Sequence, residues 1–334
     1  MCRSVPSWIL LTCVLVTISS GCRTTVPIHA WTPPQLESAV GKRVALSGVL
    51  GPKELTRPIE QQLFSQAPAD HGRQVTMISL GDLVTYESRS SQLNHRTSSG
   101  IQLVSAMEEI PNDLAVATVA RNQGIDYVLR GEVISKKNPS FHDDRNAGTL
   151  SMSWRLTGLD AAHPGGGTPI VLDVNAARRI YPDLAFVSDA NDVLCTAMAR
   201  EALRLIAPSV DRFDVVLETP YLLPGSDTVR QGNLAARKGR WGEAENLWNE
   251  VYQQHPTQIA ALHNLALAAA AGQDFTRAKK LARKAIRLNP SKLHQQTLVW
   301  IELKQREYHQ AFALPDPPEG WFLTDAVEPL TGNH

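Results

Sequence analysis

The chain has 334 residues, enough for about two domains of ordinary size. Its hydrophobic content of 43% is typical of a folded protein and argues against a disordered chain. Basic and acidic residues each number 33, so the formal net charge is zero. Because neutralisation of phosphates drives nucleic-acid binding, this balance argues against a nucleic-acid partner.

The first segment is typical of a bacterial export signal. Arg3 precedes an apolar run, Ile9–Ser20, that is shorter than the roughly 20 apolar residues needed to cross a bilayer. The sequence Ser19-Ser20-Gly21-Cys22 resembles the lipobox of bacterial lipoproteins, although serine replaces the usual leucine at the first position. The resemblance implies that residues 1–21 are removed and that Cys22 receives a diacylglycerol. The alternative is an ordinary cleaved signal with an incidental cysteine.

The residues after Cys22 bear on the location of the protein. Several acyl chains on one cysteine give stable anchoring, because each buried CH₂ contributes roughly 0.8 kcal/mol. Arg23 occupies the place where an aspartate retains lipoproteins in the inner membrane, so the resemblance implies an outer-membrane anchor facing the periplasm. Residues 22–40 contain three prolines and no clear hydrophobic period, which predicts a tether.

Residues 41–220 are predicted to form an α/β domain. Apolar spacing predicts a strand at Val44–Leu46, a helix at Pro58–Gln66 and a second strand at Val75–Ser79. Asn112 is expected to begin a helix that is apolar on every face and therefore buried, ending at Gly124.

The second half of this domain shows clearer periodicity. Ile125–Ser135 and Leu150–Leu156 alternate apolar and polar residues, which predicts half-buried antiparallel strands. A turn at His163–Gly167 leads to a partner strand that reaches Val174. A helix over Ser188–Ile206 is expected to close the domain.

Asn122–Val133 reads NQGIDYVLRGEV and resembles the helix–strand signature G-h-D-h-h-h-x-G-x-h, where h is hydrophobic. It is similar to the periplasmic α/β domains of the curli secretion-channel family, of the penicillin-binding-protein activator lipoproteins, and of the N-terminal part of the Tol translocation protein. The resemblance implies an α+β fold: a small mixed β-sheet backed by helices, which docks on other envelope proteins and has no active site.

Sequence motifs for catalysis are missing. The chain has no Gly-rich phosphate loop, no nucleophile elbow and no helical histidine pair around a glutamate. The nearest acid–base cluster, His142-Asp143-Asp144, is expected to be a solvated turn, and Cys195 a small buried hydrophobe rather than a catalytic thiol. We therefore predict no enzyme activity, no cofactor and no metal, unless residues distant in sequence converge into a site.

The C-terminal third repeats itself. Three residue pairs are separated by 34 positions: Trp241 and Phe275, Ala244 and Ala278, and Pro256 and Pro290. This period resembles the tetratricopeptide repeat. The resemblance implies an all-α helical-repeat domain over residues 221–314, with repeats at 225–258 and 259–292, a degenerate third at 293–314, and a tail at 315–334.

In tetratricopeptide proteins the first helix of each repeat lines a concave groove that holds peptides. By position, the resemblance places Asn233, Arg237, His263, Asn264 and Leu267 in such a groove. The two asparagines match positions that clamp a C-terminal carboxylate in some members, although a valine replaces the usual lysine partner. The alternative is that these residues are merely solvated.

Anchor and repeats together predict a non-enzymatic, lipid-anchored adaptor that binds a protein or peptide partner. The alternative function is a structural subunit of an envelope export or assembly complex that oligomerises through the α/β domain. A basic stripe on the second repeat would attract anionic lipid or an acidic partner, unless it is only a solvated face. Its members are Arg277, Lys280, Lys284 and Arg287.

Overall fold

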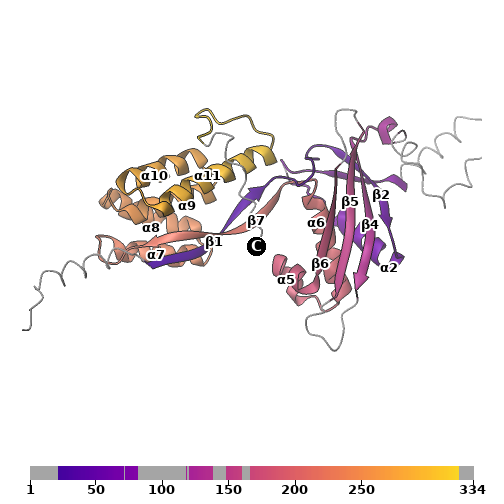
Figure 1. Ribbon diagram of the computed structural model, residues 1–334, viewed down its shortest axis with the longest axis horizontal. Coiled ribbons are helices and arrows are strands. Elements are labelled where there is room, and N and C mark those ends of the chain that lie inside the picture. The colour runs from indigo at the N-terminus through magenta and orange to yellow at the C-terminus, as the bar shows by residue number, and fades with distance from the viewer. Residues whose placement is uncertain are drawn as a thin grey trace, which may run out of the picture. The chain divides into compact units, whose positions relative to one another are not determined.

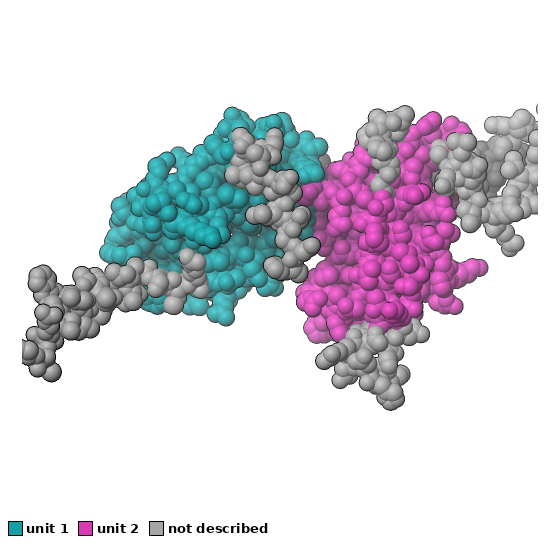
Figure 2. Space-filling view, viewed as in Figure 1, with its two compact units in different colours: residues 1–32, 210–334 teal, residues 33–209 magenta. Residues whose placement is uncertain are grey.

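The computed structural model describes residues 22–70, 72–81, 118, 120–137, 148–159 and 166–322. The chain divides into two compact units (Figure 2): unit 1 comprises residues 1–32 and 210–334, and unit 2 comprises residues 33–209. Unit 2 is therefore inserted, in sequence, between two parts of unit 1. Residues 22–32 and 210–220 were expected in a tether and in the α/β domain, and they belong instead to the unit with the helical repeats.

Unit 2 contains a five-stranded mixed sheet of order β3-β2-β4-β5-β6. β2 runs parallel to both of its neighbours, and β4, β5 and β6 form an antiparallel meander. The α+β class and the mixed sheet are confirmed. The strands are β2 (Arg43–Leu50), β3 (Thr76–Ser79), β4 (Tyr127–Lys137), β5 (Thr149–Gly158) and β6 (Gly166–Asp173).

Helices cover one face of this sheet. α2 (Lys53–Gln66) and α6 (Ala190–Arg204) pack against each other, with α5 (Val174–Ile180) and the 3₁₀ helix η1 (Pro182–Phe186) beside them (Figure 1). α6 agrees closely with the predicted helix. The predicted start of α2 at Pro58 is wrong, because the helix begins a turn earlier and the proline lies inside it.

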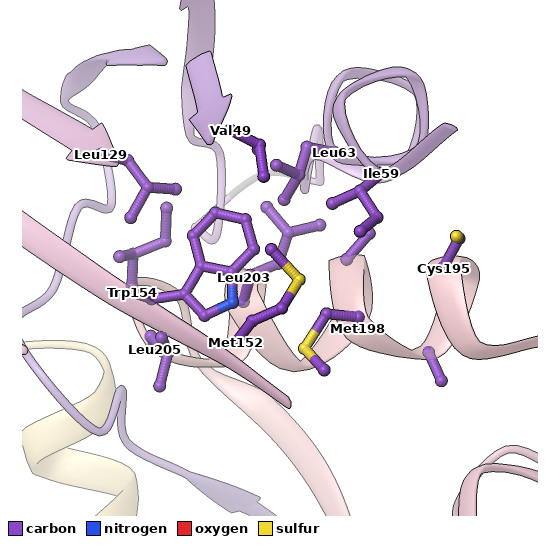
Figure 3. Packing of buried hydrophobic residues seen from close by; sticks show 14 of the residues in the cluster. Val49, Ile59, Leu63, Leu129, Met152, Trp154, Cys195, Met198, Leu203 and Leu205 are labelled. Atoms are coloured by element: carbon purple, nitrogen blue, oxygen red, sulfur yellow. The ribbon is translucent and has the colours of Figure 1, made fainter. Parts of the chain in front are cut away.

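The core of unit 2 lies between the sheet and these helices. Trp154 and Met152 project from β5 toward Met198 of α6, and Ile59 and Leu63 of α2 close the cluster (Figure 3). All five side chains are completely buried. Burying side chains of this size contributes about 1.5–3 kcal/mol each, so this layer dominates the stability of the unit.

The motif at Asn122–Val133 has a structural explanation at each of its special positions. Gly124 has φ +67°, the left-handed conformation that ends a helix. The Asp126 carboxylate accepts a hydrogen bond from the Arg43 backbone N–H at 2.8 Å. Gly131 lies opposite Trp154, and an added Cβ would be 2.7 Å from the Trp154 ring. The motif therefore builds a helix–strand turn and its neighbouring core.

In its described residues, 22–32 and 210–322, unit 1 combines a two-stranded ribbon with five helices. Thr24 Oγ1 lies 3.0 Å from Thr219 Oγ1, and Thr32 Oγ1 donates to Asp211 at 3.0 Å, so the two strands are antiparallel. The elements are β1 (Cys22–Thr32), β7 (Ser209–Thr219), α7 (Ser226–Arg237), α8 (Trp241–Gln254), α9 (Ile259–Ala271), α10 (Phe275–Leu288) and α11 (Lys292–Ala311). Each helix packs on the next one along the chain, as the 34-residue period predicts.

The expected tether is a strand over its first eleven residues. Val26 and Ile28 alternate with more exposed neighbours and are buried against the helices. The Pro27 carbonyl accepts a hydrogen bond from the Trp241 indole at 3.2 Å. Proline is compatible with an edge strand, where its missing N–H costs no ladder bond, and this is why a proline-containing segment could form β1.

The tail residues up to 322 fold back over α10 and α11. Lys279, which is 1% exposed, pairs with Glu319 at 2.8 Å. The Phe322 backbone N–H donates to Glu302 at 2.7 Å, and the Arg283 guanidinium stacks 3.4 Å above the Phe322 ring. We call residues 315–322 the strap. It covers two buried charged groups of the helix pair, Lys279 and Glu302.

Several predictions concern residues outside the described part of the chain. These are the signal segment 1–21, the start of the helix at Asn112, the cluster His142–Asp144 and most of the turn before β6. Among the helices that the structure does describe, none has both the length and the apolar character required to span a membrane.

Candidate functional site

Three of the predicted groove residues meet at one strand. Asn233 of α7 and His263 and Asn264 of α9 are buried, and each contacts β7. Leu267, one turn further along α9, is buried in the neighbouring apolar cluster. Arg237 lies exposed at the end of α7 and takes no part in these contacts.

The Asn264 side chain binds both the N–H and the carbonyl of Glu218, as the backbone of a paired strand would. Its Oδ1 accepts from the Glu218 N–H at 3.0 Å, and its Nδ2 donates to the Glu218 carbonyl at 3.0 Å. The same Nδ2 also donates to Asn233 Oδ1 at 2.9 Å. Asn233 in turn donates to the Glu218 carbonyl at 2.9 Å and to Thr219 Oγ1 at 3.0 Å. The two amides thereby satisfy a part-buried stretch of backbone.

Two histidines complete this arrangement. His263 Nε2 lies 3.0 Å from the Val216 carbonyl, which can only accept, so this nitrogen carries the proton. His294 of α11 is fully buried, with Nε2 3.1 Å from Glu218 Oε1 and Nδ1 2.8 Å from the Asn289 carbonyl. Burial opposes a charge on His294, but the Glu218 carboxylate and the Asn289 carbonyl outweigh it and raise its pKa above the usual value.

The groove predicted from the repeats is therefore filled by the chain itself. β7 lies on the asparagines and histidines, and β1, paired with it, packs against the first helix of each pair, α7, α9 and α11 (Figure 1). The prediction that these residues face a separate peptide is corrected accordingly. Asn233, His263 and Asn264 bind an extended backbone that is the protein's own.

The sequence analysis missed Glu218 and His294. A signal was present, because the buried residues Val215, Leu217 and Thr219 alternate with less buried neighbours, the pattern of a half-buried strand. The assumed domain boundary at residue 220 hid this pattern. The pairing of this strand with β1 cannot be assigned from local sequence alone.

The comparisons with known proteins reach only parts of this chain. A domain of unknown function (DUF6340) matches residues 230–311, which lie in α7 to α11. No curated protein matches the chain.

Solved structures with similarity to the chain share little sequence with it. The PelC L103M dodecamer from Paraburkholderia phytofirmans is 11% identical, with 54% of this chain and 98% of that chain covered and a TM-score of 0.30. Lipoprotein GNA1162 from Neisseria meningitidis is 16% identical, with 40% of this chain and 85% of that chain covered and a TM-score of 0.23. TolB from Acinetobacter baumannii is 15% identical, with 52% of this chain and 31% of that chain covered and a TM-score of 0.20.

A shallow polar hollow on unit 2 is a second place of interest. It opens on the sheet between β4 and β5, where Glu132 pairs with Ser153 and Arg130 with Arg155. Within the described residues, no group of three or more histidine, cysteine, aspartate or glutamate side chains is placed to hold a metal ion. Cys195 is buried as predicted, and burial raises the pKa of its thiol to about 11.

Unit 2 also presents an exposed aromatic residue on a turn that side-chain hydrogen bonds hold in place. Phe186 at the end of η1 is 94% exposed, while Leu184, two residues earlier, is buried. Arg200 of α6 binds both carboxylate oxygens of Asp183, at 2.9 and 2.7 Å, and stacks on the Tyr181 ring. Burial and the neighbouring Glu201 raise the pKa of Tyr181, so it stays a neutral hydrogen-bond donor to that carboxylate. This network fixes the turn that carries Phe186.

Proposed function

We propose that this chain is a lipid-anchored protein of the bacterial cell envelope that binds another protein through unit 2 and catalyses no reaction. Phe186 is the observation that carries the proposal. An aromatic side chain that is almost fully exposed on a fixed turn is typical of a binding hot spot, because little conformational entropy is lost when a partner covers it.

The helical repeats have a different task in this proposal. Their groove holds β7 and β1, and β1 begins at the cysteine expected to carry the acyl chains. The repeats would thus secure the anchored strand within a folded unit instead of recruiting a peptide at Asn233 and Asn264. Because β7 and β1 fill the groove, we place the surface that recruits a partner on unit 2.

A second candidate function uses the same surface. Phe186 and the nearby Ile180, which is 43% exposed, also suit contact with a second copy of the chain. The protein would then be a structural subunit of an envelope assembly that oligomerises through unit 2. The two candidates predict different masses in native mass spectrometry: a monomer for the adaptor and a defined multimer for the subunit.

Comparison of envelope complexes tests the recruiting surface. Tagged wild type, Phe186→Ser and Leu234→Ser would be captured from detergent-solubilised envelopes; Leu234, on α7 of unit 1, is 56% exposed and serves as the matched control. We expect Phe186→Ser to lose a partner, or copies of the chain, that Leu234→Ser retains. The same set of captured proteins for all three would refute the proposal.

The anchor requires a separate test. Intact mass and membrane partition of the wild type and of Cys22→Ala would be compared after expression in a bacterial host. We expect a wild-type mass that begins at Cys22 and includes acyl chains, lost in the variant together with membrane association. An unmodified wild type in the soluble fraction would rule out the lipid anchor.

A further inference from the structure

The loop between β7 and α7 is unusually apolar for an exposed segment. Pro220 and Pro224 enclose Tyr221, Leu222 and Leu223, which are 53%, 78% and 55% exposed. Three adjacent exposed apolar side chains are unfavourable in water and mark a surface that another apolar phase covers.

Neighbouring side chains hold this loop in shape. Arg230 donates to the Pro220 carbonyl at 3.2 Å, and its guanidinium lies 5.4 Å from the centre of the Tyr221 ring. Gln258 donates to the Pro224 carbonyl at 3.1 Å, and Ser226 Oγ donates to the Leu223 carbonyl at 2.6 Å. The exposure of the apolar side chains is therefore built into the folded unit.

The position of the loop indicates what covers it. Thr24 of β1 pairs with Thr219 of β7, and this antiparallel register places Cys22 level with Tyr221. The residue expected to carry acyl chains thus lies at the same end of unit 1 as the apolar loop. Because β1 already begins at Cys22, the strand itself leaves little chain between the anchor and the folded unit.

The same end carries basic side chains. His294 contacts both Glu218 and the Asn289 carbonyl, so the turn between α10 and α11 lies beside the end of β7. Arg287 and Lys292 flank this turn and are exposed, as is Leu288 at 43%. Apolar side chains with cations at the same end of the unit suit the interface of a bilayer with anionic headgroups, and tyrosine is favoured at that depth.

We propose that the loop Pro220–Pro224 inserts into the surface of the bilayer that holds the acyl chains of Cys22, as a second membrane contact of unit 1. This inference rests on the proposed lipid anchor. The acyl chains bring the unit to the membrane, and the loop fixes which end of it faces the lipid. Arg287 and Lys292 bind the anionic headgroups around the loop.

Spin labelling of the full anchored chain tests the contact. Nitroxide labels would be placed by Leu222→Cys and, as a control, by Leu314→Cys; Leu314 is 41% exposed and follows the opposite end of α11. Cys195 is buried and would be replaced by alanine in both proteins. The proteins would be reconstituted in vesicles of phosphatidylethanolamine and phosphatidylglycerol, and the accessibility of each label to oxygen and to a polar nickel complex would be measured.

We expect the label at position 222 to be more accessible to oxygen than to nickel, as within a bilayer, and the label at 314 to show the reverse. A label at 222 that is open to nickel would overturn the inference, since the loop would then be in water. A label shielded from both reagents would also overturn it, because a protein would cover the loop. Intact mass separates the two proposals: an unacylated chain refutes the anchor, and an acylated chain with an aqueous loop refutes only the insertion.

Discussion

At the scale of single residues, the account depends on side chains that bind backbone. Asn264 is the centre of the network, since it contacts both the N–H and the carbonyl of Glu218 and also orients Asn233. Loss of this amide removes all three of these hydrogen bonds, so it costs more than the loss of one ordinary hydrogen bond.

Replacement of Asn264 tests this role. We expect Asn264→Ala to lower the free energy of unfolding of unit 1 by about 2 kcal/mol, because three hydrogen bonds are lost, two of them to the Glu218 backbone. Arg237→Ala, on the exposed end of α7, is the control and should change stability by less than about 0.5 kcal/mol. Denaturant unfolding followed by circular dichroism measures both. Equal stability of the two variants would show that the amide does not hold β7.

His294 gives the same network a dependence on pH. Its pKa is raised in the folded protein, because Glu218 and the Asn289 carbonyl outweigh the effect of burial. Protonated His294 therefore stabilises unit 1 fully below the ordinary histidine pKa of about 6.5, and this contribution is lost as the pH rises through the folded value. We expect the melting temperature of the wild type to fall relative to that of His294→Gln between mildly acidic and mildly basic pH. Parallel pH profiles of the two proteins would contradict the ion pair.

At the scale of secondary-structure elements, the strands and helices with a clear hydrophobic period could be predicted from the sequence. β5 and α6 were predicted nearly to their ends, because strict alternation and an apolar stripe each have one interpretation. α2 was placed too late, since Pro58 was taken as a first-turn residue and instead lies inside the helix. β1 was missed because the helices that cover it are far away in sequence, and β7 because the predicted domain boundary at residue 220 separated it from its helices.

The candidate site was predictable to a similar degree. The repeat pattern located Asn233, His263 and Asn264 correctly on the helices that line the groove. The occupant could not be predicted, because the pairing of β1 with β7 joins residues almost two hundred positions apart. The sequence around either strand contains no pattern that predicts the pairing of β1 with β7.

The strap is an element with its own pH dependence. The bond from Lys279 lowers the pKa of Glu319 to about 2 from its ordinary 4.5. The stabilisation is present above pH 4.5 and is lost as the pH falls toward 2. We expect Glu319→Gln to melt several degrees below the wild type at pH 6, and the difference to shrink in acid. A constant difference across this range, in thermal melts at matched ionic strength, would contradict the pairing.

At the scale of the whole molecule, the insertion of unit 2 between β1 and β7 is the feature with the widest consequences. Unit 1 is completed only when a strand near the start of the chain pairs with one that follows unit 2. Removal of the segment after residue 225, which would otherwise test the repeats, would leave β1 and β7 without the helices that cover them. Single substitutions are therefore the appropriate probes.

Hydrogen–deuterium exchange of the wild-type chain, read by mass spectrometry, tests the central claim most directly. The claim is that β1 and β7 fill the helical groove and form one folded unit with it. The account predicts that peptides covering residues 24–32 and 210–219 exchange as slowly as peptides from α9. Exchange of these two segments at the rate of unstructured chain, while α9 stays protected, would mean that the groove is open, and the assignment of its asparagines to β7 would be refuted.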